Sequence, residues 1–151
     1  MLHFYGGSGL TDPITDDKGL SGISIFSLVK FDSTLYGIGD INDISLFVGN
    51  ADTNYKYNSP KISIVCGDGL ILDTYFRMID NRYVIGSVPT DAEWVTYGIA
   101  GNQVMTIGNI DVLGGTTSER KIWLRCSLPA GISTANFTGE KLVITAEEEE
   151  L

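Results

Sequence analysis

Apolar and polar residues alternate along most of the chain, and many of the apolar positions carry β-branched or aromatic side chains. Successive side chains of a strand point to opposite faces, so a period of two predicts half-buried β-strands. Glycine, asparagine and aspartate lie between the alternating segments, as they do in tight turns. The pattern predicts short strands at residues 23–31, 43–48, 61–66, 70–79, 82–88, 94–99, 103–112, 120–127 and 141–146.

One helical signal follows Pro89. Thr90 and Glu93 have the spacing of a capping box, in which each side chain accepts a hydrogen bond from the backbone amide of the other residue. The next residues, from Trp94 to Tyr97, include β-branched and aromatic side chains that disfavour a helix. The sequence therefore allows one helical turn at this place, followed by a strand from residue 94.

These features predict an all-β fold, a two-sheet antiparallel β-sandwich of Ig-like or jelly-roll type rather than an up-and-down barrel. No repeat or linker divides the chain, so residues 21–146 are predicted to form one domain. Residues 1–20 are expected to form an extended N-terminal arm, and residues 147–151 an acidic C-terminal tail. Both ends are expected to become ordered through contact with another protein chain.

Composition and charge narrow the classes of function. Hydrophobic residues make up 43% of the 151 positions, which excludes a disordered chain, and no apolar run approaches the roughly 20 residues of a membrane span. The net charge of −9 opposes binding to nucleic acid or to anionic lipid. The N-terminus has no secretion signal, so the protein is expected to stay in the cytoplasm in which it is made.

The two cysteines, Cys66 and Cys126, are far apart in the sequence and neither belongs to a CxxC motif. Zinc ligation and a thioredoxin-like site are therefore disfavoured. We expect both to be reduced, buried thiols. A disulfide is the alternative, against which the lack of a secretion signal counts.

Candidate catalytic and metal-binding groups are sparse. The only histidine is His3, and the carboxylates of Asp73, Asp80, Glu93 and Asp111 are expected to be solvated. The aspartates that could serve calcium lack the order of an EF-hand. The sequence therefore predicts no catalytic residue, no metal site and no cofactor.

Aromatic and acidic residues remain as candidates for recognition. Tyr55 and Tyr57 lie in a polar segment that is expected to face solvent, and Trp123 is expected on the strand face opposite Ile122 and Leu124. Tyrosine and tryptophan present large rigid surfaces at low entropic cost. The candidate interface residues are Phe4, Tyr5, Tyr55, Tyr57, Trp94, Trp123, Glu147, Glu148, Glu149 and Glu150.

A stretch at residues 119–146 carries two short motifs, Pro-Ala-Gly from residue 129 and Phe-Thr-Gly from residue 137. In this order they resemble the last two strands of immunoglobulin-like sandwiches of bacterial and phage origin. Proline ends strand pairing, glycine allows the turn, and the aromatic residue fills the end of the sandwich. An acidic β-sandwich with extended ends is also similar in design to capsid decoration and other auxiliary structural proteins of tailed bacteriophages.

The resemblance implies a noncatalytic virion structural protein, made in the host cytoplasm. It would form a homo-oligomer, with a trimer favoured, and would cement or decorate a capsid or tail by bridging neighbouring subunits. Its expected partner is the major capsid protein or another virion protein, with no nucleic acid and no membrane. The alternative is a carbohydrate- or receptor-binding module, in which Tyr55, Tyr57 and Trp94 would form an aromatic platform.

Overall fold

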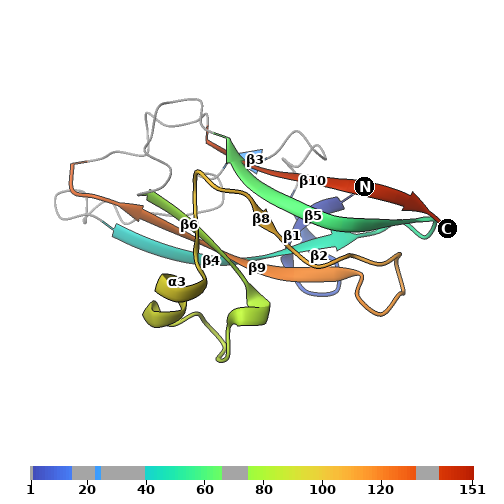
Figure 1. Ribbon diagram of the computed structural model, residues 1–151, viewed down its shortest axis with the longest axis horizontal. Helices are drawn as coiled ribbons and strands as arrows, with labels where there is room; N and C mark the ends of the chain where they lie inside the picture. Colours follow the sequence, from blue (N-terminus) through green and yellow to red (C-terminus); the bar gives the residue numbers. More distant parts are fainter. Residues whose placement is uncertain (1, 15–22, 25–39, 66–74, 132–139) are drawn as a thin grey trace.

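The computed structural model describes residues 2–14, 23–24, 40–65, 75–131 and 140–151, and two antiparallel sheets contain most of these residues (Figure 1). The larger sheet has six strands and the smaller has four. Side chains from both sheets form one apolar core between them. The predicted all-β arrangement of two antiparallel sheets is therefore confirmed.

The six-stranded sheet has the order β2-β1-β4-β9-β6-β7, and the four-stranded sheet has the order β3-β10-β5-β8. The strands of the larger sheet are β1 (Leu2–Gly7), β2 (Thr11–Pro13), β4 (Asp40–Asn50), β6 (Phe76–Asp80), β7 (Ile99–Ala100) and β9 (Glu119–Leu128). Those of the smaller sheet are β3 (Ile23–Ser24), β5 (Tyr55–Val65), β8 (Met105–Thr106) and β10 (Lys141–Glu150). Pairing of β4 with β9 and of β5 with β10 joins segments that are far apart in the sequence.

The core follows the period-two pattern. Leu46 and Val48 of β4 point inward from the larger sheet, and Ile62 and Ile64 of β5 point inward from the smaller one, as the alternation predicts. Cys126 of β9 is a buried free thiol, also as predicted. The remainder of the predicted strand from residue 23, Cys66, residues 70–74 and the Phe-Thr-Gly motif lie outside the described residues.

The N-terminal residues are part of the fold, so the predicted arm is wrong for residues 2–13. β1 pairs with β4, and Phe4 and Tyr5 are buried rather than available to a partner. The turn-forming residues make the β1–β2 hairpin, in which Gly9 has a φ of 69°. Its backbone N–H donates a 2.8 Å hydrogen bond to Glu119. Contacts within the chain therefore order this segment.

Two predicted strands are largely absent from the described sheets. Residues 82–88 were expected to return from a hairpin, but β6 leads into a 3₁₀ turn, η3 (Asn81–Tyr83), and then an irregular loop. Residues 103–112 contribute only the short β8 and a single bridge between Ile110 and Tyr57. Asp80 accepts a 3.1 Å hydrogen bond from the backbone N–H of Arg82, which favours the turn over a continuing strand.

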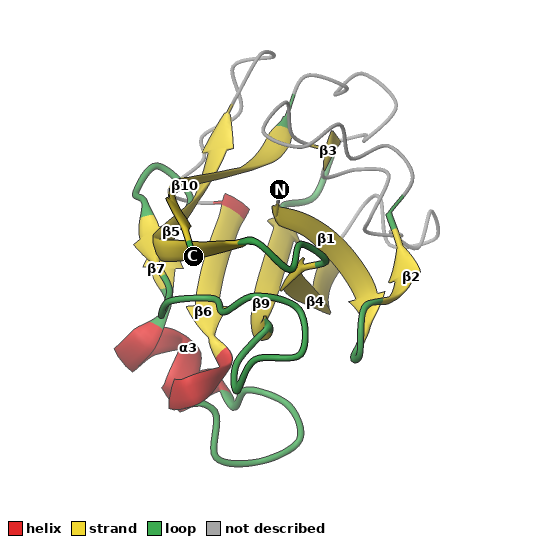
Figure 2. Ribbon diagram, turned by 90° about the vertical axis from the view of Figure 1, so that its right-hand side faces the viewer, coloured by secondary structure: helices red, strands yellow, loops and turns green. Residues whose placement is uncertain are grey.

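The helix α3 (Asp91–Tyr97) covers part of the outer face of the six-stranded sheet, next to β6 (Figure 2). A strand beginning at Trp94 was expected, and this expectation is wrong. The predicted capping box is present, with both reciprocal hydrogen bonds between Thr90 and Glu93. Trp94 packs with Ile79 and Trp123 in a second apolar cluster, so tertiary contacts overcome the low helix propensity of this segment.

Candidate interaction surfaces

The C-terminal half of β10 pairs with the start of β5 and gathers six of the predicted interface residues at one place. The register partners are Glu147 with Asn58, Glu148 with Tyr57, Glu149 with Lys56, and Glu150 with Tyr55. We call this pair of segments, residues 55–58 and 147–150, the acidic ribbon. The expectation of a separate acidic tail is therefore wrong, because all four glutamates belong to a strand.

One face of the acidic ribbon is anchored to the fold by Tyr57. Only 3% of this residue is exposed, so its prediction as a solvent-facing residue is wrong. Its backbone N–H and C=O both bond to Ile110, and its hydroxyl donates a 3.0 Å hydrogen bond to Glu148 Oε1. Burial raises the pKa of Tyr57 above its ordinary value, and the neighbouring Glu148 raises it further.

The burial of Tyr57 is explained by the hydrogen bonds of Asn50, which precedes the turn into β5. The side chain of Asn50, itself buried, donates to the carbonyls of Tyr55 and Asp111 at 2.7 and 2.9 Å. These bonds hold the segment that contains Ile110 against the start of β5. A buried amide with both of its donors satisfied stabilises the loop that covers Tyr57.

The other face of the ribbon is open and polar. Glu149 accepts a 2.7 Å hydrogen bond from Asn58 and lies 3.1 Å from Lys56 Nζ, and both contacts lower the pKa of Glu149. Glu147 and Glu150 have no cationic partner among the described residues. With four exposed carboxylates and one lysine, the ribbon keeps an excess of negative charge.

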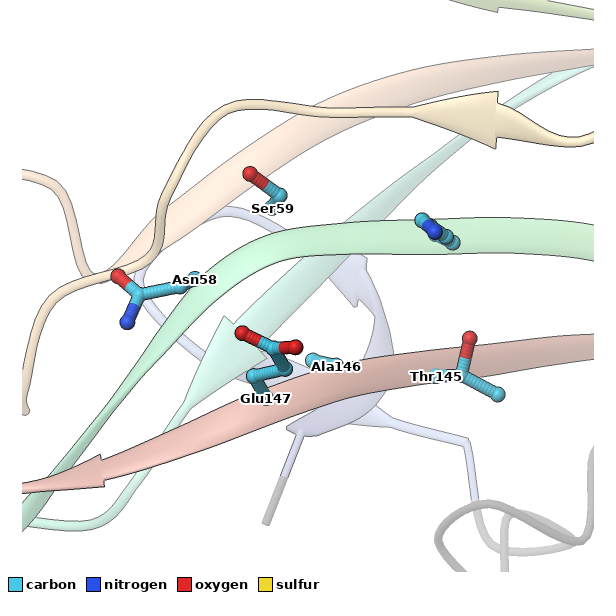
Figure 3. A pocket seen from close by; sticks show the side chains of 6 residues that line it. Asn58, Ser59, Thr145, Ala146 and Glu147 are labelled. Atoms are coloured by element: carbon cyan, nitrogen blue, oxygen red, sulfur yellow. The ribbon is translucent and has the colours of Figure 1, made fainter.

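A groove of about 320 Å³ lies where β5 and β10 bend together (Figure 3). The register shifts between Thr145 and Glu147, and Ser59 has a φ of 44° on the facing strand. Such bulges twist a strand pair and redirect its side chains. The lining residues come from both strands: Asn58, Ser59, Lys61, Thr145, Ala146 and Glu147. Their mixture of hydroxyls, one amide and one pair of opposite charges makes a polar groove.

Two of the carboxylates considered for catalysis, Asp80 and Glu93, serve the fold instead. Asp80 and Glu93 are buried, which corrects the expectation that they are solvated. Glu93 accepts 2.9 Å hydrogen bonds from the backbone N–H groups of Thr90 and Ile85, and these bonds lower its pKa. Within the described ranges, no cluster of three or more His, Cys, Asp or Glu side chains is arranged to hold a metal ion.

The aromatic candidates near α3 are buried. Trp94 is 2% exposed, and Trp123 lies on the face opposite Ile122 and Leu124, as predicted, where α3 covers it. The indole N–H of Trp123 donates a 2.9 Å hydrogen bond to Asn81. Neither tryptophan is free to stack on a ligand from solvent.

Apolar side chains that the sequence pattern assigned to strands are exposed around α3 instead. Ile85 is 97% exposed and Val95 is 83% exposed, with Val88 nearby in sequence. Tyr83 and Tyr97 stack with ring centroids 4.8 Å apart. We call these five residues the α3 surface. The sequence signal for the α3 surface is the capping box, because it places a helix at α3. Glu93 of the capping box also accepts a hydrogen bond from the backbone N–H of Ile85, which ties the preceding loop to the helix.

Comparisons of the chain with protein-family models, with curated proteins and with solved structures found no significant match. Among the described residues, no helix is long and apolar enough to cross a membrane.

Proposed function

We propose that this chain is a noncatalytic structural protein of the virion type. In this proposal it forms a homo-oligomer, with a trimer favoured, and bridges neighbouring subunits of a phage capsid or tail. The partner is the major capsid protein or another virion protein. We also propose an Ig-like or jelly-roll type for the sandwich, which the long-range pairing of β4 with β9 and of β5 with β10 supports.

The observation that carries the proposal is the presence of two different contact surfaces on one small domain. The α3 surface is apolar, and exposed apolar patches are typical of protein contacts. The acidic ribbon is charged and suits a basic patch on a partner. Figure 1 shows α3 and the C-terminal end of β10 well apart along the long axis, so two neighbours can be contacted together.

The carbohydrate- or receptor-binding alternative loses its aromatic platform. It required Tyr55, Tyr57 and Trp94 to be exposed side by side, whereas Tyr57 and Trp94 are buried and belong to separate apolar clusters. Sugar binding by stacking needs an accessible ring face. This burial favours the structural proposal over the alternative.

Sedimentation velocity over a range of protein concentrations tests the homo-oligomer. The wild-type chain is expected to sediment as a trimer, and the double variant Ile85→Asp, Val95→Asp as a folded monomer, since buried charge opposes association. Val104→Asp is the matched control, because Val104 is also exposed but lies outside the α3 surface. A wild-type chain that stays monomeric at high concentration contradicts the homo-oligomer.

The virion assignment has an independent test in the genome. A gene for this chain next to a major capsid gene supports the proposal. If the gene lies inside an operon of metabolic enzymes in several genomes, this argues against the proposal.

A further inference from the structure

Two arginines lie directly opposite each other on the outer face of the six-stranded sheet. Arg77 of β6 is the register partner of Arg125 of β9, and Asp43 of β4 is the next residue in the same row. Like charges at such directly paired positions destabilise a sheet unless an anion balances them. The row therefore places two guanidinium groups side by side beneath α3.

A cavity of about 260 Å³ lies at this row, between the sheet and α3. Its floor includes Arg77 and Arg125 together with Tyr75 and Ser127, and its wall includes Asp91 and Trp94. We call these six residues the arginine cleft. Its volume suits a side chain or a small organic molecule rather than a polymer.

Arg125 is already neutralised within the cleft. Its Nε and Nη2 donate to the two Asp43 carboxylate oxygens at 2.8 and 2.9 Å, and Nη2 also lies 3.4 Å from Asp91 Oδ1. The guanidinium stacks on the Trp94 ring, 4.7 Å from its centroid. These contacts fix Arg125 in place in the floor of the cleft.

Arg77, by contrast, has no acidic partner among the described residues, although it is only partly exposed. A second unsatisfied polar group belongs to Trp94, which also lines the cleft. Trp94 Nε1 is buried and has no hydrogen-bond acceptor in the part of the chain that the structure describes. Buried donors without acceptors are rare and costly. The two residues that carry the unbalanced cation and the unsatisfied donor, Arg77 and Trp94, therefore both line the cavity.

We propose that the arginine cleft binds a carboxylate group, with Arg77 as its charged partner and Ser127 as a further donor. A planar carboxylate matches the paired N–H groups of a guanidinium. Arg77 has no acidic partner among the described residues and so offers its positive charge to a carboxylate, whereas a dianionic phosphate would meet stronger repulsion from Asp43 and Asp91. The proposal does not depend on the virion function.

The carboxylate has two possible sources, an acidic side chain of a neighbouring polypeptide and a free small acid. NMR titration of the full chain, labelled with ¹⁵N, separates them. One arm uses a capped tripeptide with a central glutamate and its glutamine analogue, and the other uses butyrate and the neutral butyramide. Methyl phosphate tests the preference for a carboxylate. The Trp94 Nε1–H signal and the arginine Nε–H signals report binding at the cleft.

The expected result is saturable shifts of these signals by the glutamate peptide, by butyrate, or by both, and none by the neutral analogues. Binding of the peptide alone assigns the site to a polypeptide, and binding of butyrate alone assigns it to a free acid. Arg77→Gln should weaken binding at least about tenfold, or about 1.4 kcal/mol. Lys141→Gln is the control, since it removes the same charge from an exposed position on the other sheet.

Arg77→Gln also separates binding from folding. Because it removes a like-charge pair, the variant should unfold at the same temperature as the wild type or slightly higher. The proposal is overturned if no carboxylate probe binds at millimolar concentration or if Arg77→Gln binds as well as the wild type. Tighter binding of methyl phosphate would overturn the choice of ligand.

Discussion

The hydroxyl of Tyr57 donates a hydrogen bond to Glu148 across the acidic ribbon, so a buried aromatic residue holds an exposed carboxylate in place. The direction of the bond also fixes its pH dependence. The phenol must keep its proton to donate, and this is why Glu148 raises the pKa of Tyr57.

Tyr57→Phe is expected to lower the free energy of unfolding by about 1 kcal/mol, the typical net value of one hydrogen bond. Urea denaturation at neutral pH measures this change. Tyr55→Phe is the matched control, since the Tyr55 hydroxyl has no partner among the described residues. An equal loss in both variants would contradict the role of the hydrogen bond.

The raised pKa of Tyr57 predicts a loss of stability in alkali. Above the ordinary tyrosine pKa of 10.0 the unfolded chain releases this proton while the folded chain retains it, so stability is full below that pH and falls above it. Unfolding midpoints at about pH 9 and about pH 11 should differ less in Tyr57→Phe than in Tyr55→Phe. Equal differences would show that Tyr57 is not responsible.

Thr90→Ala is expected to cost about 0.5–2 kcal/mol, because it removes the oxygen that accepts a 3.2 Å hydrogen bond from the Glu93 backbone. Thr96→Ala, at an exposed position in the same helix, should change stability little.

The lowered pKa of Glu93 predicts a pH-dependent contribution of this residue to the stability of the fold. The contribution is present above the ordinary glutamate pKa and is lost as the pH falls through the lowered pKa of Glu93 in the folded protein. Thermal melts of Glu93→Gln in acid should therefore converge on those of the wild type.

Deletion of residues 147–151 is expected to lower the unfolding temperature, because it removes the C-terminal part of β10, which pairs with the start of β5, and uncovers Tyr57. The double variant Glu147→Gln, Glu150→Gln keeps the strand and removes two like charges, so it should be as stable as the wild type or more stable. Thermal unfolding of the two proteins distinguishes backbone pairing from charge. A deletion with unchanged stability would mean that the segment is a solvated end.

Cys126 is expected to resist thiol reagents in the folded protein, since burial raises its pKa and keeps the reactive thiolate scarce. In a Cys66→Ala background, labelling should be slow in buffer and rapid in denaturant. Cys126→Ala should cost about 1 kcal/mol through lost packing. Rapid labelling of the folded chain would contradict the buried position.

The long strands could be predicted from the sequence because their inward residues repeat with a period of two. Leu46, Val48, Ile62, Ile122 and Ile144 all lie where the pattern predicts. These positions depend on local alternation, which the buried face of a sheet enforces on every strand.

The interaction surfaces could not be predicted in the same way, because they depend on pairing between distant segments. Four successive glutamates lack any apolar alternation, and only the register with β5 makes them a strand. Trp94 begins a run of poor helix formers, yet packing against Trp123 and Ile79 stabilises α3. The pairing of Arg77 with Arg125 requires the register of two strands that the intervening chain separates.

β10 has a further consequence for how copies of this chain behave in concentrated solution. Among the described residues, β3 pairs only with Lys141 and Leu142, and no described strand pairs with residues 143–150 on this side of β10. Open edges are templates for β-aggregation, and charged side chains are a common protection against it. The four glutamates therefore protect the edge of β10 against pairing with the same edge of another copy. In acid, protonation of the glutamates removes the charge repulsion between two such edges.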